Sequence, residues 1–415
     1  MLPIIKALSR LFLFLLLPVF SFAQTGHRAF AADEAMWQNS RVDLFGLSQY
    51  ASNSFKPSQV TSFILGNTVD DTYLDNLATE AQDVNRVFYQ DGLNVAYRHV
   101  MNEKTSITVS LSQGNFSSIT APSTAFQFAA YGNTPFKGET IDIELLKVQY
   151  FACSKLRLGY MKTLDLCNGQ FQLQLGASLV QGQNLIDIEV NNSSLFTEEN
   201  AEYLDLTYDY DYTYLNQAAM FSGVGFDLNL EARYWKENKF ALNAWVRDLG
   251  NVYWSGNEME SGSARGQISY EGLFFSFEEL SNFGSNNEIQ NKADSLRDLL
   301  RADTRNSKTL SLPYNLGVSY TQYIGDGEAL IFSGQFVPGY YERPVGSIRF
   351  RHFIDDNLNA SLSYCNGPFG GSAFDMTVGY QTKRICAEVA VNGFLRVSAV
   401  NVPLTGGWIR LNYFI

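Results

Sequence analysis

The chain has 415 residues, 46% of them hydrophobic, 14% aromatic and 17% charged, and a formal net charge of -12. The negative charge argues against a nucleic-acid partner, because proteins that bind nucleic acids present a basic face to the phosphates. The mean hydropathy is -0.12, so the many apolar residues are interleaved with polar ones. That average is typical of a transmembrane barrel, whose strands face lipid on one side and the lumen on the other.

Residues 1–23 have the pattern of a secretory signal peptide. Lys6 and Arg10 supply its positive charge, an apolar core runs from Leu11 to Phe20, and small residues precede Gln24. No later stretch reaches the roughly 18 consecutive apolar residues of a membrane-spanning helix. We therefore expect an exported protein of the bacterial outer membrane, in contact with outer-membrane lipid and with the barrel assembly machinery.

Residues 24–57 precede the first predicted strand, and we expect them to form an N-terminal plug or a periplasmic extension. The barrel would then occupy residues 58–415. Two segments break the strand period and carry apolar residues at helical spacing, Asp71 to Phe88 and Asn287 to Arg301. Both lie in long connections, where we expect short helices that cap, plug or bind something.

A period of two runs through most of the chain and predicts β-strands. From Gly223 to Tyr234 apolar residues occupy every second position, and Asp227, Glu231 and Arg233 lie between them. A helix cannot bury this pattern, since its 3.6-residue turn would spread the charges around the axis. The period predicts an all-β, transmembrane, antiparallel up-and-down barrel of about 14 strands. The strands fall near residues 58–65, 92–100, 105–112, 142–163, 170–182, 216–235, 240–253, 312–323, 329–338, 345–354, 358–365, 372–381, 385–393 and 406–415.

The connections between these strands are alternately short and long, as in outer-membrane barrels with tight periplasmic turns and longer outer loops. The short ones are Met101–Lys104, Asp165–Gly169, Lys236–Lys239, Gly325–Glu328, Asp355–Asn357 and Thr382–Arg384. The long ones are 66–91, 113–140, 183–215, 256–311, 339–344, 366–371 and 394–406. Asp142–Thr163 could be divided at Cys153, but the alternation keeps its phase across that point, so we predict one long strand.

The connection from Glu198 to Tyr214 contains Tyr208, Tyr210, Tyr212 and Tyr214, which alternate with two aspartates. This pattern could bind a sugar, a peptide or Ca²⁺ through oxygen ligands. The favoured interpretation is an interfacial aromatic girdle that continues as an exposed strand. The spacing lacks the glycine and the terminal Glu of a calcium loop.

The chain offers little for catalysis. His27, His99 and His352 are its three histidines, and none has a metal-ligand spacing or lies beside a nucleophile motif. His99 and His352 share the parity of apolar neighbours, which indicates the membrane-facing surface. The four cysteines, Cys153, Cys167, Cys365 and Cys386, form no recognisable disulfide framework. We predict no enzyme activity, no catalytic or metal-binding residues and no cofactor.

Nine charged residues have the parity of the lumen in this scheme. They could line a conduction path for a polar or amphipathic solute. Alternatively, they pair with one another across a closed lumen, since charges away from water need partners, and this structural interpretation is favoured. The residues are Asp227, Glu231, Arg233, Arg247, Arg349, Arg351, Asp375, Glu388 and Arg410.

Two short segments carry a resemblance to a known family, Trp245-Val246-Arg247-Asp248-Leu249-Gly250-Asn251-Val252-Tyr253-Trp254 and Leu312-Pro313-Tyr314-Asn315-Leu316-Gly317-Val318. With the hairpins that follow, they resemble an uncharacterised outer-membrane β-barrel family of Bacteroidota, a domain of unknown function. In that family an Asp-Leu-Gly strand end and an aromatic residue precede a long loop, and a Leu-Pro opens a run of hairpins. In plan the chain is also similar to long-chain fatty-acid transporter barrels. It lacks their N-terminal signature, so their substrate does not carry over.

The last strand alternates to the final residue. Ile409, Leu411, Tyr413 and Ile415 share one face, and Arg410 and Asn412 the other. We expect the apolar face to meet lipid and the strand to pair beside the first one, closing the barrel.

The leading functional hypothesis is transport of a hydrophobic or amphipathic small molecule across the outer membrane, gated by the helical loop segments and the N-terminal region. The alternative is a structural or partner-binding barrel, an accessory to a secretion or surface-attachment machine with a cell-surface protein partner. An apolar pocket running from the loops into the lumen would favour transport. A continuous ion-paired interior would favour the structural role.

Overall fold

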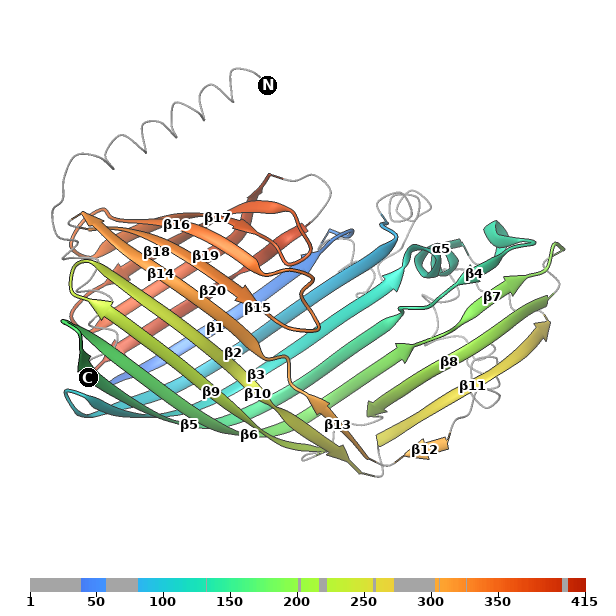
Figure 1. The fold of residues 1–415 in the computed structure, drawn as a ribbon, viewed down its shortest axis with the longest axis horizontal. Helices are drawn as coiled ribbons and strands as arrows, with labels where there is room; N and C mark the ends of the chain where they lie inside the picture. The colour runs from blue at the N-terminus through green and yellow to red at the C-terminus, as the bar shows by residue number, and fades with distance from the viewer. Residues whose placement is uncertain are drawn as a thin grey trace, which may run out of the picture.

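A computed structural model of the protein describes residues 39–56, 81–131, 133–200, 203–215, 222–256, 259–271, 303–305, 307–325, 327–397 and 402–415. Its strands form a closed antiparallel barrel of 14 strands (Figure 1). Each barrel strand pairs with the next, and β20 pairs with β1 to close the ring. The predicted fold class is therefore confirmed. The barrel strands are β1 (Arg41–Ser52), β2 (Val84–Asn102), β3 (Thr105–Pro122), β5 (Lys147–Leu166), β6 (Gly169–Val190), β9 (Gly223–Lys236), β10 (Phe240–Ser255), β14 (Asn315–Gly325), β15 (Glu328–Phe336), β16 (Val345–Phe353), β17 (Leu358–Asn366), β18 (Ser372–Gln381), β19 (Ile385–Arg396) and β20 (Val402–Phe414).

The outer surface carries exposed large apolar side chains on every barrel strand. A belt of this kind is unfavourable in water and is the surface that a bilayer solvates, so the wall spans a membrane. One such residue from each strand, in chain order, is Val42, Leu93, Val109, Leu158, Leu175, Leu228, Leu242, Val318, Phe332, Ile348, Leu362, Met376, Val389 and Ile409.

The short connections all lie at one end of the barrel, where polar turns join the strand pairs, as predicted. β5 is one uninterrupted strand across Cys153, which confirms the prediction for that segment. On β20, Ile409, Leu411 and Tyr413 are exposed on the outer surface beside β1, as expected, and so is Ile415 directly after the strand.

The start of the barrel differs from the prediction. β1 lies within residues 24–57, the range expected to form a plug or an extension, and it pairs with β2 along its whole length. The first strand expected at 58–65 lies outside the described residues, as do the signal segment 1–23 and the helical segment Asn287–Arg301. The other expected helix is wrong at its end, because Val84 to Phe88 belong to β2. Pairing with β1 and β3 outweighs the local helical spacing there.

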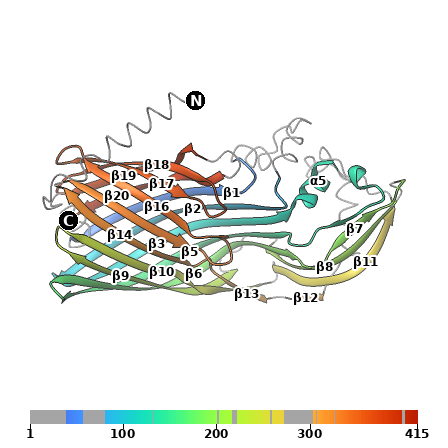
Figure 2. The same cartoon turned by 45° about the horizontal axis from the view of Figure 1, so that its top comes forward.

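At the opposite end, the longer connections carry secondary structure of their own and project from the barrel (Figures 1 and 2). The expected loops 113–140 and 183–215 contain parts of β3 and β6 together with new elements. The additional elements are β4 (Thr140–Asp142), β7 (Ser194–Thr197), β8 (Tyr203–Leu215), β11 (Met259–Glu271), β12 (Asp303–Arg305), β13 (Ser307–Ser311), helix α5 (Ser123–Tyr131) and the short 3₁₀ helix η2 (Thr134–Phe136). Strand ends such as Ser117-Ser118 lack the apolar alternation, because they lie beyond the lipid-facing belt, and sequence periodicity therefore misses them.

We call the part formed by β4, β7, β8, β11 and the far ends of β5 and β6 the extension. β8 pairs with β6 on one side and with β11 on the other. A small core of Phe136, Ile141, Leu195 and Leu204, with Phe128 of α5 packed against it, holds its tip together. No helix of the described chain is long and apolar enough to cross a membrane.

Candidate functional site

The loop between β15 and β16 reaches across the mouth of the barrel at the end that bears the extension. β15 and β2 lie opposite each other in the ring, with β3, β5, β6, β9, β10 and β14 between them on one side and β16–β20 and β1 on the other. Tyr341 of the loop nevertheless packs on Phe88 of β2, with ring centroids 5.1 Å apart. The loop therefore crosses the lumen.

Five aromatic side chains pack together where the loop meets β2, β3 and β5, and we call this cluster the aromatic gate: Phe88, Phe116, Phe151, Tyr340 and Tyr341. Phe116 is its centre and meets Tyr340 edge to face at 4.6 Å and Phe151 in a stacked arrangement at 5.1 Å. Phe88 and Phe116 are buried, and so is Tyr341. Edge-to-face and stacked aromatic pairs of this kind add to the energy of burial itself.

Polar contacts fix the loop that carries Tyr340 and Tyr341. Both of their backbone N–H groups donate to the Val337 carbonyl, at 3.1 and 2.9 Å, so the loop forms a tight turn. The Arg86 guanidinium on β2 lies 3.7 Å from the Glu342 carboxylate. Because both side chains of this ion pair are partly exposed, the pair adds little to the stability of the loop.

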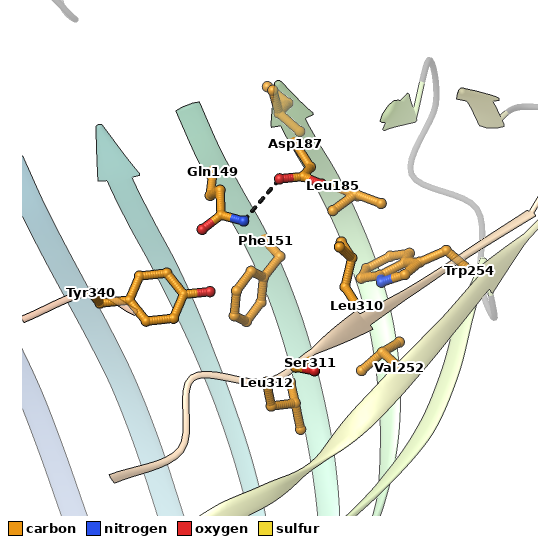
Figure 3. A pocket seen from close by; sticks show the side chains of 11 residues that line it. Gln149, Phe151, Leu185, Asp187, Val252, Trp254, Leu310, Ser311, Leu312 and Tyr340 are labelled. Carbon is orange, nitrogen blue, oxygen red and sulfur yellow. Dashed lines mark hydrogen bonds between the residues drawn. The ribbon is translucent and has the colours of Figure 1, made fainter. Parts of the chain in front are cut away.

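A small hollow, partly open to solvent, lies beside the aromatic gate, and we call it the pocket (Figure 3). Its walls come from four places: the inner faces of β5, β6 and β10, and the β13–β14 junction, with Tyr340 entering from the loop. Most of the lining is apolar and includes Phe151, Leu185, Trp254 and Leu312. Concave, mainly apolar sites with few polar groups are the usual form of small-molecule sites.

Trp254 forms a buried wall of this pocket, and two glycines make room for its ring. A Cβ on Gly182 of β6 would lie 2.3 Å from the indole, and one on Gly223 of β9 would lie 2.7 Å from it. The ring is therefore packed against the backbone of β9, the neighbour of β10, and of β6 beyond it, and is buried. Any side chain at either glycine would displace it.

The polar side of the pocket is Asp187. Gln149 donates a hydrogen bond to one carboxylate oxygen at 2.9 Å, and Lys308 lies 2.6 Å from the other. The carboxylate is thus satisfied by its neighbours, which leaves the apolar wall as the surface offered to a ligand. Burial, and secondarily Asp187, raises the pKa of Tyr340 to about 12, so the phenol is neutral near pH 7.

Deeper in the lumen, four charged side chains form a cluster. Lys155 lies 2.6 Å from Asp248 and 3.1 Å from Asp227, and Arg157 lies 3.0 Å from Asp248. Asp227 is fully buried and also accepts a hydrogen bond from Ser178 at 2.7 Å. Two cations thus balance two carboxylates, as a buried ionic cluster requires.

A β-bulge in β10 builds both this cluster and the pocket. The pairing of β10 with β9 slips between Val246 and Leu249, and Asp248 has a positive φ of 62°. Arg247 and Asp248 consequently both face the lumen, and beyond them the even-numbered positions turn inward, which brings Trp254 to the pocket. A bulge re-aims side chains in this way. Position 250, just after the bulge, requires glycine, because a Cβ there would lie 1.9 Å from the Phe226 carbonyl oxygen.

The other predicted lumen residues form separate groups rather than one row. On the β9–β10 side, Glu231 lies 3.0 Å from Arg247, and the Arg233 guanidinium stacks over Trp235. Across the ring, Arg410 lies 3.3 Å from Glu388.

The remaining three lie on β16 and β18. The Arg349 guanidinium donates to Ser363, and Arg351 lies over the Phe353 ring. Asp375 accepts a hydrogen bond from the backbone N–H of Gly393 at 2.7 Å. Whether any of the nine contacts a solute stays a prediction.

His99 and His352 are both exposed, on positions that alternate with the lumen-facing ones.

Sequence reasoning missed the aromatic gate. The sequence pattern places Phe88 in a helix, Phe116 in a loop, and Tyr340 and Tyr341 in a connection without a role. The parity of β5 places Phe151, Lys155 and Arg157 on the inner face and could have identified them. No local signal shows that a loop reaches the opposite wall.

Comparison with known proteins places the chain in a family through residues 38–392, which match a family of unknown function, DUF5723. The chain belongs to this family. No curated protein sequence matches it. Membership therefore agrees with the resemblance seen in the sequence and adds no assigned activity.

Among solved structures, the chain is similar to a TodX deltaS2S3 mutant described as a monoaromatic hydrocarbon channel, with 9% identity, a TM-score of 0.46 and coverage of 92% of this chain and 91% of that one. It is also similar to a FadL homologue of Pseudomonas aeruginosa, with 9% identity, a TM-score of 0.40 and coverage of 95% and 93%. The translocator domain of the autotransporter NalP from Neisseria meningitidis has 9% identity, a TM-score of 0.35 and coverage of 95% and 100%. Likeness this remote carries no argument about function.

Proposed function

We propose that the protein transports a hydrophobic or amphipathic small molecule across the outer membrane, and that the aromatic gate controls access to its lumen. The observation that carries the proposal is the apolar pocket at the mouth, which shares Phe151 and Tyr340 with the gate. A solute bound there would lie directly against the side chains that close the lumen. Movement of the loop that bears Tyr340 would then join pocket and lumen.

The charged lumen beneath the gate favours an amphipathic solute over a purely apolar one. Asp227 is fully buried, but the Arg247 and Arg410 side chains are 49% and 40% exposed. Part of the lumen is therefore polar and accessible to water. A solute with a polar end can replace those water contacts, whereas an alkane cannot.

The proposed role is transport rather than catalysis. The histidines on described strands, His99 and His352, are exposed on the outer surface, away from the aromatic gate and the charged cluster. The pocket is lined mainly by apolar side chains, which can bind a solute and exclude water. Its one carboxylate, Asp187, is held by Gln149 and Lys308.

Uptake of a fluorescent hydrophobic probe into proteoliposomes tests the proposal. We expect wild-type protein to admit the probe faster than empty vesicles, and a Tyr340→Ala, Tyr341→Ala variant to admit it faster still. Conductance across a planar bilayer should rise in the same order. If neither protein exceeds empty vesicles in either assay, the transport proposal is wrong.

The alternative, a structural or partner-binding barrel, draws on the ion-paired cluster of Lys155, Arg157, Asp227 and Asp248. A filled, paired lumen would stiffen the wall and leave function to the extension. In that case the loop variant would lose stability without gaining conductance.

A further inference from the structure

The extension is a two-faced sheet, and its two faces have different chemistry. On β8, Tyr208, Tyr210, Tyr212 and Tyr214 share one face. The opposite face carries acidic and hydroxyl side chains, and there Asp209 forms an ion pair with Arg265 of β11. The pocket and the aromatic gate use neither face.

The four tyrosines form one continuous row. Neighbouring ring centroids are 6.1, 5.9 and 5.9 Å apart along the strand. With a rise of about 3.3 Å per residue, the row is roughly 20 Å long. We call it the tyrosine platform.

The rings lie down across β11 instead of standing up from the sheet. Their partners on β11 are small: Gly266 opposite Tyr208, Ala264 opposite Tyr210 and Gly262 opposite Tyr212. A Cβ on Gly266 would lie 2.5 Å from the Tyr208 hydroxyl, which places that ring over the glycine. Ala264 is buried on the same face.

The far end of the platform is held by hydrogen bonds to β11. The Tyr212 hydroxyl donates to one oxygen of Glu260 at 3.2 Å, and the Tyr214 hydroxyl donates to the other. Rings fixed in this way, covered by strand backbone on one side, present the other side outward. Tyrosine supplies contact area with little loss of conformational entropy, because only two side-chain torsions must be fixed.

The platform continues the lipid-facing surface of the barrel. On β5, Leu158 and Leu156 are exposed on the outer surface, and Tyr150 has the same parity with no slip in the pairing to β3. Tyr150 is paired with Ile186 of β6, and Ile186 is paired with Tyr214 of β8. Residues directly opposite each other share a face. The platform therefore faces sideways, over the membrane, above the belt of aliphatic residues.

We propose that the tyrosine platform binds the sugar chains of the glycolipid in the outer leaflet. The inference rests on the proposed outer-membrane location, where these chains stand beside the barrel above the acyl region. The electron-rich face of an aromatic ring attracts the polarised C–H groups of a sugar ring, and the phenol rim tolerates water. Acyl chains fit less well, because the extension rises beyond the aliphatic belt.

Hydroxyl-radical footprinting of the full chain in vesicles tests this assignment. One set of vesicles contains lipopolysaccharide with long sugar chains, and the other contains the same lipid stripped to lipid A. Tyr203 is the matched control, since it lies on β8 with the opposite parity and is exposed. We expect at least threefold slower modification of Tyr208 to Tyr214 with sugar chains present, and an unchanged rate at Tyr203.

Equal rates in the two membranes would overturn the proposal. Equal protection of Tyr203 would also overturn it, because that result means general crowding. Protection by free O-chain polysaccharide in detergent, without protection in sugar-bearing vesicles, would contradict the assignment to the membrane's own lipid.

Variants separate the platform from the transport function. Gly266→Ala should lift the Tyr208 ring, and Tyr210→Leu with Tyr212→Leu should remove two rings while keeping apolar cover over β11. Both should lower the ratio of sugar-bearing lipid to protein after purification several-fold, and the matching Phe variants should keep it. Probe uptake should be unchanged in all of them, so failure here is distinguishable from failure of the transport proposal. An unchanged lipid ratio in both platform variants would overturn the inference.

Discussion

Phe116 and Tyr340 meet edge to face with ring centroids 4.6 Å apart, although one belongs to β3 and the other to a loop anchored on the far side of the barrel. Through this contact, the short loop between β15 and β16 spans the mouth of the barrel. The other contacts of the loop with this side of the barrel are the Tyr341 ring on Phe88 and the partly exposed pair of Glu342 with Arg86, so its position depends mainly on aromatic packing.

Tyr340→Ala should open the mouth. Tyr340 is half-buried, so loss of its ring should cost less than the roughly 3 to 5 kcal/mol of a fully buried aromatic side chain. Most of that cost falls on the closed state of the loop. Single-channel recording should show a higher open probability than in the wild type. Tyr340→Phe keeps the ring against Phe116 and should behave like the wild type. Equal recordings for the Ala and wild-type proteins would mean that Tyr340 does not close the lumen.

High pH should open the same closure. The pKa of Tyr340 is raised to about 12 by burial, from about 10 for a free phenol. Its contribution to the closed state is therefore fully present below pH 10 and is lost as the pH rises through 12. Conductance should increase over that window, with a late phenolate absorbance change that is smaller in Tyr340→Phe, because Tyr210 and Tyr341 also have raised pKa values. A Phe variant with the wild-type pH profile would contradict this cause.

Gly182→Ala should abolish the apolar wall of the pocket. The added methyl would lie 2.3 Å from the Trp254 ring, so the indole must leave its position between β6 and β9. We expect tenfold weaker binding of a hydrophobic probe and a red-shifted tryptophan emission. Gly346→Ala is the control, because a Cβ there meets nothing within 4 Å. Unchanged binding in Gly182→Ala would exclude this pocket as the solute site.

Lys155→Met should destabilise the barrel. It leaves Asp227, which is fully buried, without its nearest cation at 3.1 Å, and breaking a buried ion pair costs about 3 to 5 kcal/mol. Urea unfolding in detergent, followed by heat-modifiable migration, measures the loss. The control Lys104→Met removes an exposed pair with Asp165 at 2.6 Å and should leave the midpoint unchanged. Similar midpoints for both variants would show that the cluster is not a stabilising element.

The sequence by itself determined the barrel. Alternation with a period of two assigns one face of each strand to lipid, and a single-residue slip would put charges such as Asp227 into the membrane. The short turns and the closing strand followed from that constraint, whereas far strand ends such as Ser117-Ser118 did not. The family resemblance lay in Asp248-Leu249-Gly250, whose physical role as a bulge became clear only with the pairing of β9 and β10.

Only the tertiary structure decided what lies inside and above the barrel. The aromatic gate joins Phe88, Phe116 and Tyr340 across the lumen, and no local period encodes contact between opposite walls. The start of the barrel at β1 was hidden for a related reason, because its partners β2 and β20 lie far along the chain. The tyrosine pattern was visible in the sequence, but its orientation depends on the pairing of β8 with β6 and β11. Contact with lipid requires an apolar residue at every second position of each strand, so it is visible in the sequence. Contacts between distant segments require no such local pattern.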